Sequence, residues 1–142
     1  MAENRGNEVS VKVAVIHFTG HCDTLQLDTL DSHSVALGWT YMEDGAILPF
    51  SDIDCDGIWS FLRNNLLARP AEEREESLGR AIGRVLAHEL YHIFVNTTRH
   101  SSHGVAKPYY SVQELLSRSF QFEQKESDEL RRYWSDVVTG GF

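Results

Sequence analysis

Residues 78–94 read LGRAIGRVLAHELYHIF, and their apolar side chains recur at the spacing of an α-helix. The preceding stretch, which follows Pro70, is rich in glutamate, and the positive end of a helix dipole favours anions there. The sequence therefore predicts one long helix that starts after Pro70 and runs to about Phe94. Its broad apolar face consists of Leu78, Ile82, Val85, Leu86, Leu90, Ile93 and Phe94.

This helix contains an HExxH motif, His88-Glu89-Leu-Tyr-His92. Residues four apart lie on nearly the same face of a helix, one turn along its axis. Two imidazoles in this arrangement can bind one metal ion, with Glu89 beside it. The alternative is that His88 and His92 are ordinary surface imidazoles of an amphipathic helix.

A catalytic zinc site needs a third protein ligand and an open fourth position for water. His100 is the favoured candidate for the third ligand, and the alternatives are His103 and Glu114. A histidine so close in sequence returns to the metal only if the helix stops soon after His92. Asn96 tolerates a left-handed helix cap, and the β-branched residues around it weaken a helix, so the sequence predicts this early stop.

The N-terminal half predicts three short strands. The first, Val9–Phe18, alternates β-branched with other residues, and the second spans Val35–Met42. Glu43-Asp44-Gly45 is typical of a hairpin turn and leads into a third strand, Ala46–Phe50. Because Pro49 cannot donate a ladder hydrogen bond, the third strand is expected at an edge of the sheet.

Three further helices are predicted around this core. The first spans Asp56–Leu67, with Asp54 or Asp56 as its cap. Ser111-Val-Gln-Glu114 has the capping-box pattern that opens another helix, and a last one covers about Ser127–Val138. We expect a single domain over residues 1–142, with residues 1–8 as a tail without fixed structure.

Composition narrows the classes of partner. The chain has 142 residues, of which 42% are hydrophobic and 24% charged, as in a soluble globular domain. The formal charge of −8 repels phosphate backbones, so no nucleic-acid partner is expected. No apolar run approaches the roughly 20 residues of a membrane span, and residues 1–8 lack the apolar stretch of a signal peptide. We expect a monomer, and the sequence leaves the cellular compartment open.

Two cysteines, Cys22 and Cys55, are too few and too far apart for a zinc ribbon. They could pair in an oxidising compartment or remain buried thiols in a reducing one, and both readings are favoured over a Cys22 thiolate bound to the metal. Residues 52–57 imitate the first half of a calcium loop, but Arg63 stands where that loop needs a bidentate glutamate. The acidic residues of this stretch are therefore expected to end a strand and cap a helix.

The region from the HExxH motif onward resembles the metzincin clan of zinc metallopeptidases, particularly short bacterial matrixin-like proteins. The signature of that clan is HExxH, a glycine turn, a third histidine and a downstream Met-turn. His88, Glu89 and His92 match it residue for residue, and His100 resembles the third ligand, two residues later than in the standard spacing. Residues 101–105 resemble the stretch that leads into the Met-turn.

The resemblance implies an α+β, zincin-like fold. Such a fold has a small twisted mixed sheet with an edge strand over the cleft, a long active-site helix and C-terminal helices. Ile47–Phe50 resembles the edge strand along which these enzymes align their substrates. The chain departs from the family pattern because Asn96 replaces the turn glycine, Tyr91 fills a position that is often glycine, and no methionine follows Met42.

The activity implied by the resemblance is that of a zinc-dependent endopeptidase acting on a peptide or protein. The implied ligands of Zn²⁺ are His88, His92 and His100. Glu89 would be the general base that takes a proton from a metal-activated water and passes it to the leaving amine. Tyr109 or Tyr110 would donate a hydrogen bond to the oxyanion or the substrate.

Two other functions fit parts of the sequence. The missing glycine and methionine are compatible with a non-catalytic zinc-binding or interaction module that has a degenerate peptidase fold. Endoribonucleases with a three-histidine metal site usually carry glycine where Glu89 stands, and they need a cationic surface for RNA. Glu89 and the charge of −8 therefore argue against the endoribonuclease.

Overall fold

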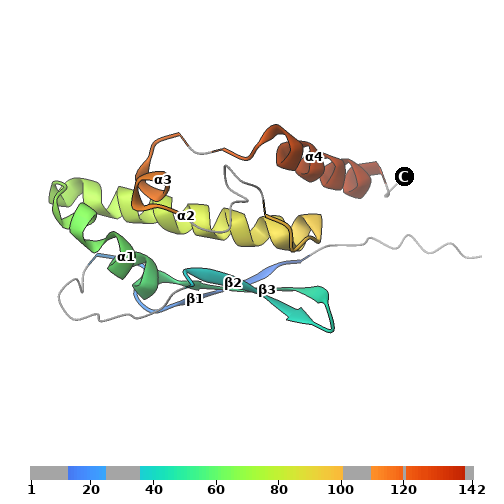
Figure 1. Ribbon diagram of the computed structural model, residues 1–142, viewed down its shortest axis with the longest axis horizontal. Coiled ribbons are helices and arrows are strands. Elements are labelled where there is room, and N and C mark those ends of the chain that lie inside the picture. The colour runs from blue at the N-terminus through green and yellow to red at the C-terminus, as the bar shows by residue number, and fades with distance from the viewer. Residues whose placement is uncertain (1–12, 25–35, 101–109, 120, 140–142) are drawn as a thin grey trace, which may run out of the picture.

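The computed structural model describes residues 13–24, 36–100, 110–119 and 121–139. Within these ranges the fold is mixed α+β, as predicted, and Figure 1 shows its elements. The tail expected at residues 1–8 and residues 9–12 of the first predicted strand lie outside the described residues. The elements in chain order are β1 (Val15–Thr19), β2 (Gly38–Glu43), β3 (Ala46–Asp54), α1 (Cys55–Leu67), α2 (Ala71–Val95), α3 (Val112–Leu116) and α4 (Gln124–Thr139).

The three strands form one mixed sheet in the order β1-β3-β2. β3 runs parallel to β1 and antiparallel to β2, to which it is joined by the predicted hairpin turn. Asp44 and Gly45 both have positive φ angles, of 49° and 78°, as a two-residue turn between twisted strands requires.

The expectation that residues 46–50 form an edge strand is wrong, because β3 is the central strand of the sheet. Pro49 is tolerated there for a local reason. The pairing of β1 with β3 begins only at Phe50, and the register between β2 and β3 shifts between Thr40 and Met42. The missing N–H of Pro49 therefore falls where β1 does not reach and where the ladder with β2 is already irregular.

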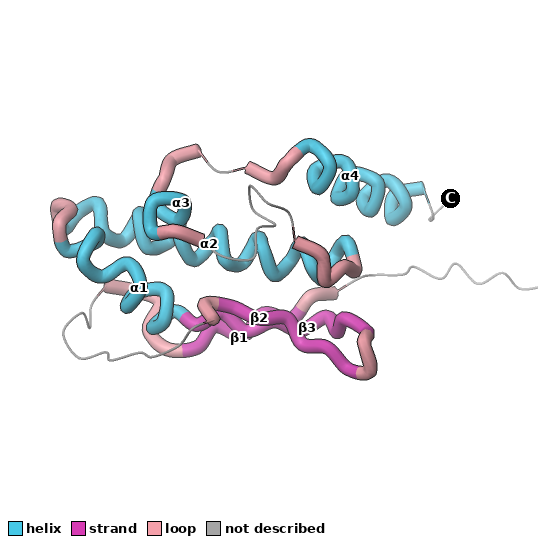
Figure 2. The backbone as a smooth tube through the Cα atoms, in the orientation of Figure 1, coloured by secondary structure: helices cyan, strands magenta, loops and turns pink. Residues whose placement is uncertain are grey.

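Helix α2 lies at the centre of the molecule. Figures 1 and 2 show it running along one face of the sheet, with α3 and α4 on its other side, and α1 also packs against it. The long helix predicted after Pro70 is thus confirmed. The other helices, β2 and β3 pack around it. None of the helices in the described part of the chain is both long and apolar enough to cross a membrane.

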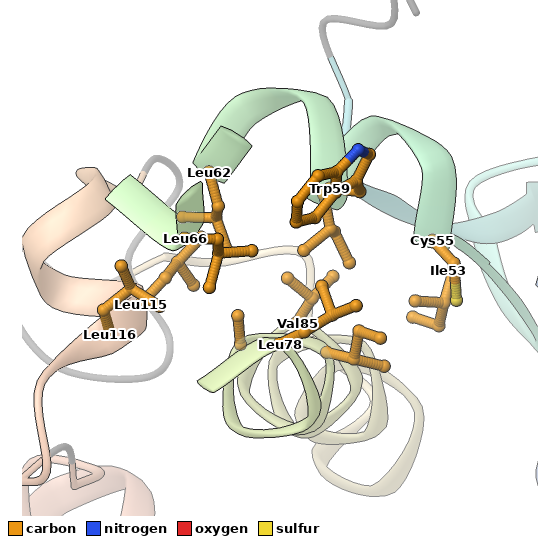
Figure 3. Packing of buried hydrophobic residues seen from close by; sticks show 12 residues of the cluster. Ile53, Cys55, Trp59, Leu62, Leu66, Leu78, Val85, Leu115 and Leu116 are labelled. Carbon is orange, nitrogen blue, oxygen red and sulfur yellow. The ribbon is translucent and has the colours of Figure 1, made fainter. Parts of the chain in front are cut away.

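The buried core joins α1 and α2 to the end of β3 and to α3. Figure 3 shows side chains of α1 and α2 meeting between the two helices, with Ile53 on one side and the α3 leucines on the other. Burial of such side chains contributes about 1.5–3 kcal/mol each relative to exposure. The core residues labelled there are Ile53, Cys55, Trp59, Leu62, Leu66, Leu78, Val85, Leu115 and Leu116.

The predicted caps are present at two helices. The Asp54 carboxylate accepts the Gly57 N–H at 2.9 Å at the start of α1, and Ser111 and Glu114 form a complete capping box at α3. The Asp56 carboxylate accepts a hydrogen bond from the backbone N–H of His21 at 2.7 Å. These contacts account for two of the acidic residues that imitate a calcium loop. The last helix begins at Gln124, three residues before the predicted start.

Cys22 and Cys55 form a disulfide, which was one of the alternatives left open by the sequence. It ties the segment after β1 to the first residue of α1, where Cys55 is fully buried. The same segment is held by the backbone N–H of Thr24, which donates to Glu75 of α2 at 2.8 Å. The disulfide therefore fixes the exit from β1 against α1, and the hydrogen bond to Glu75 fixes it against α2.

Replacement of both cysteines by alanine is expected to lower the free energy of unfolding by about 3–4 kcal/mol. The bond closes a loop with a sequence separation of 33 and so removes entropy from the unfolded chain. Urea denaturation of the wild type and the Cys22→Ala/Cys55→Ala variant measures the difference. With a reducing agent present, the two proteins should unfold at nearly the same urea concentration. Equal midpoints without reductant would show that the disulfide contributes nothing.

Candidate metal centre

The two histidines and the glutamate of the HExxH motif lie on the buried side of α2. His88, Glu89 and His92 are 7%, 4% and 8% exposed, respectively. The four-residue spacing places the two imidazoles one turn apart, and their Nε2 atoms are 3.0 Å from each other. The sequence-based placement of both rings on one face of a helix is therefore confirmed.

Helix α2 ends soon after His92, as the sequence predicts. Asn96 adopts the left-handed conformation with φ 54° and ψ 52°, and the Thr97 N–H donates to the His92 carbonyl oxygen at 3.2 Å. The chain then turns back and brings Nε2 of His100 to 3.1 Å from Nε2 of His92. An asparagine thus provides the turn that glycine provides more commonly.

The three histidines form a possible metal site. Their ligand nitrogens all lie within 4.8 Å of one another, and no other such group occurs among the described residues. Two nitrogens bound to one zinc at about 2.0–2.1 Å with a tetrahedral angle are about 3.3 Å apart, close to both contacts of His92. His88 and His92 are buried whereas His100 is exposed, so the site opens to solvent on the His100 side. The donor set suits Zn²⁺ as well as other divalent transition metals.

Hydrogen bonds to the other ring nitrogens favour the ligand form of two of these histidines. Nδ1 of His92 lies 2.7 Å from the Thr97 carbonyl oxygen, which can only accept, so Nδ1 carries the proton and Nε2 keeps its lone pair. Nδ1 of His88 lies 2.7 Å from the Tyr110 hydroxyl oxygen. When His88 donates in this contact, its Nε2 is also free to bind a metal.

The electrostatic surroundings favour the neutral form of His92 and His100. Burial lowers the pKa of His92, although the bond to the Thr97 carbonyl opposes this effect. Burial and the neighbouring His92 lower the pKa of His100. Neutral imidazole is the form that binds metal ions, so protons are expected to compete less with a metal at His92 and His100 than at histidines whose pKa is not lowered.

Glu89 lies beside the three nitrogens. Its Oε1 atom is 4.0 Å from Nε2 of His88, and its Oε2 atom accepts a hydrogen bond of 2.6 Å from the Thr40 hydroxyl. Burial raises the pKa of Glu89, and the bond from Thr40 partly counteracts the rise. A raised pKa makes a carboxylate a stronger proton acceptor, which suits a general base beside a metal site.

Contacts from α4 brace the segment that carries the third histidine. The Tyr91 hydroxyl, on the residue before His92, donates to Oε2 of Glu129 at 2.8 Å. Nη2 of Arg99, on the residue before His100, lies 4.0 Å from Oε1 of the same carboxylate. Glu129 thus joins the end of α2 to the segment that returns to the metal site. Tyr91 therefore has a structural role here.

An open cleft of about 500 Å³ adjoins the histidines. β2 forms one wall, so the edge strand beside the site is β2 and not residues 46–50. The wall is largely apolar, and Glu89 is the only acidic residue among the described lining residues. The apolar side chains that line the cleft include Leu37, Trp39, Met42, Ile47, Phe61 and Val85.

The remaining sequence-based candidates have different positions. Tyr110 lines the cleft and contacts His88, and burial and the charge of Glu89 raise its pKa, so the hydroxyl stays protonated. The Glu114 carboxylate accepts the Ser111 N–H at 2.9 Å in the capping box. His103 and Tyr109 lie outside the described residues.

Sequence reasoning did not find two groups that contact the site, the Thr40 hydroxyl and the Thr97 carbonyl. No sequence signal points to Thr40, because it reaches Glu89 through the pairing and packing of the sheet. The Thr97 carbonyl could have been anticipated, since a helix that stops at Asn96 leaves backbone groups of the next residue near the last turn.

Comparison with models of known protein families, with curated proteins and with solved structures gives no match for this chain.

Substitution of Tyr110 by phenylalanine is expected to weaken zinc binding about tenfold, because His88 loses the partner that orients its ring. Competition titration with a chromogenic chelator measures the affinity. Replacement of Tyr41, whose hydroxyl contacts Asp52 elsewhere on the sheet, by phenylalanine is the matched control and should leave the affinity unchanged. An affinity of the Tyr110 variant equal to that of the wild type would exclude an orienting role.

Proposed function

We propose that this protein is a zinc-dependent endopeptidase with a zincin-like active site. His88, His92 and His100 would hold the ion, and Glu89 would act as the general base. The observation that carries the proposal is the buried Glu89 carboxylate, 4.0 Å from Nε2 of His88 in a cluster of three converging imidazoles. A metal site with purely structural ligands has no need of a proton acceptor at that position.

The composition of the site supports hydrolysis. His88, His92 and His100 would leave one position of a bound zinc ion open, where the ion would lower the pKa of water and polarise a carbonyl group. Oε1 of Glu89, 4.0 Å from Nε2 of His88, would accept a proton from the water and pass it to the leaving amine. The Thr97 carbonyl and the Tyr110 hydroxyl hold the rings of His92 and His88 in place.

The cleft supports a peptide as the substrate. Among the described residues β2 is an edge strand, so no strand of this part of the chain pairs with the backbone N–H and C=O groups on one side of it. An extended peptide can pair with such an edge while its side chains enter neighbouring hollows. Because β2 forms a wall of the cleft that contains the histidines, a peptide paired there would pass close to Glu89.

Metal analysis combined with a proteolysis assay tests the proposal. The purified protein is expected to bind about one zinc ion per chain and to cleave members of a mixed fluorogenic peptide library. A zinc chelator should abolish cleavage, and added zinc should restore it.

Two results would contradict the proposal in different ways. Stoichiometric zinc without cleavage of any peptide would indicate the non-catalytic binding module instead. Failure to bind zinc or any other divalent metal would remove the basis for both functions.

A further inference from the structure

We propose that Thr40, supported by Ser51, is a positioning residue that holds one oxygen of Glu89 and thereby assigns proton transfer to the other. This inference rests on the proposed function, since it concerns the general base of that site. It involves residues of the sheet that lie far from the HExxH motif in the sequence.

The geometry places two hydroxyl groups in line with the carboxylate. Thr40 of β2 and Ser51 of β3 are direct partners in the antiparallel register, so their side chains lie side by side on the face towards α2. Their oxygen atoms are 2.7 Å apart, and Oγ1 of Thr40 is 2.6 Å from Oε2 of Glu89. Ser51 is only 1% exposed, so water has little access to its end of this chain of hydrogen bonds.

The directions of these hydrogen bonds follow from which groups have a proton to donate. An ionised carboxylate can only accept, so Thr40 donates its single hydroxyl proton to Glu89. In the bond between the hydroxyls, Ser51 must then be the donor. The main-chain oxygen of Glu89 is a poorer acceptor for Thr40, because it lies 3.4 Å away. Donors in series polarise one another, and the bond that reaches Glu89 is strengthened.

The two carboxylate oxygens consequently have different roles. Oε2 is occupied by the bond from Thr40, whereas Oε1 is the oxygen that lies 4.0 Å from Nε2 of His88. Proton transfer needs a base held at a defined distance and angle from the reacting water. Thr40 supplies this constraint from the sheet, independently of the helix that carries Glu89.

Three variants test the assignment with kinetics. Thr40→Val keeps the shape and β-branching of the side chain but removes the hydroxyl, and Thr40→Ser restores the hydroxyl. Thr19→Val is the matched control, because Thr19 is a β1 residue whose hydroxyl donates to the Ile53 carbonyl at 3.3 Å. We expect Thr40→Val to lower kcat by about 10- to 100-fold, with KM and zinc affinity changed by less than about twofold. Thr40→Ser and Thr19→Val should stay within about twofold of the wild type.

A crystallographic readout keeps the inference testable without turnover. In crystal structures of the zinc-loaded proteins, the Glu89 carboxylate should face His88 in the wild type and in Thr40→Ser, and turn away in Thr40→Val. An unchanged carboxylate and an unchanged kcat in Thr40→Val would overturn the inference, as would an equal loss of kcat in Thr19→Val. If the wild type cleaves no peptide, the proposed function fails, and the position of the carboxylate alone decides the role of Thr40.

Discussion

Replacement of Glu89 by glutamine is expected to lower peptide hydrolysis by about 10²- to 10⁴-fold while the zinc content stays the same. Glutamine keeps the size of the side chain and can still face the Thr40 hydroxyl, but its amide cannot take up a proton at neutral pH. Because the imidazoles alone form the metal cluster, the loss of the carboxylate leaves the ligand set intact. Steady-state kinetics and metal analysis of the same preparation measure both effects.

The matched control for Glu89→Gln is Glu76→Gln. Glu76 lies on the same helix, its side chain is 76% exposed, and it pairs with Arg80 one turn away. We expect the control to retain wild-type turnover, since an exposed ion pair contributes at most about 1 kcal/mol to stability. Full activity of Glu89→Gln would exclude this residue as the general base and would refute the proposed mechanism.

Removal of a single imidazole is expected to weaken zinc binding by more than about 100-fold. Loss of a group that only hydrogen-bonds to a ligand weakens binding by up to about 100-fold, and loss of the ligand itself should have a larger effect. His92→Ala should have the largest effect, because Nε2 of His92 lies between those of His88 and His100. His100→Ala should also lose the metal, although this exposed side chain contributes less to the packing. Equilibrium dialysis against zinc buffers gives the affinities, and circular dichroism shows whether each variant is folded.

Two other histidines serve as comparisons. His17 lies on β1 and pairs with Asp52 at 3.5 Å, so His17→Ala should leave zinc affinity unchanged. His103→Ala tests the alternative third ligand suggested by the sequence, and we expect it to bind zinc normally. Normal zinc binding by His100→Ala together with its loss in His103→Ala would move the third ligand to His103.

The parts of the fold that sequence reasoning predicted well depend on local physical chemistry. The long helix follows from periodicity within one segment, and the Ser111–Glu114 capping box from four adjacent residues. Asn96 is the clearest case, because its tolerance of the left-handed region predicts both the helix end and the return of His100.

The parts that sequence reasoning missed depend on contacts between distant segments. Pro49 pointed to an edge strand because a missing N–H is tolerated there, but the short β1 and the irregular pairing with β2 make room for it in the central strand. Thr40, Ser51 and Glu89 come together only through strand register and helix packing. No pattern within the separate segments indicates that these three residues are in contact.

The carboxylate of Glu129 has a consequence for the order in which the protein matures. Translation runs from the N-terminus to the C-terminus, so all three imidazoles are made before the residue that braces Tyr91 and Arg99 beside them. On the ribosome, the growing chain therefore lacks this brace until the segment with Glu129 has emerged and docked. The brace between the end of α2 and the His100 segment is therefore expected to form late, once α4 has packed against α2.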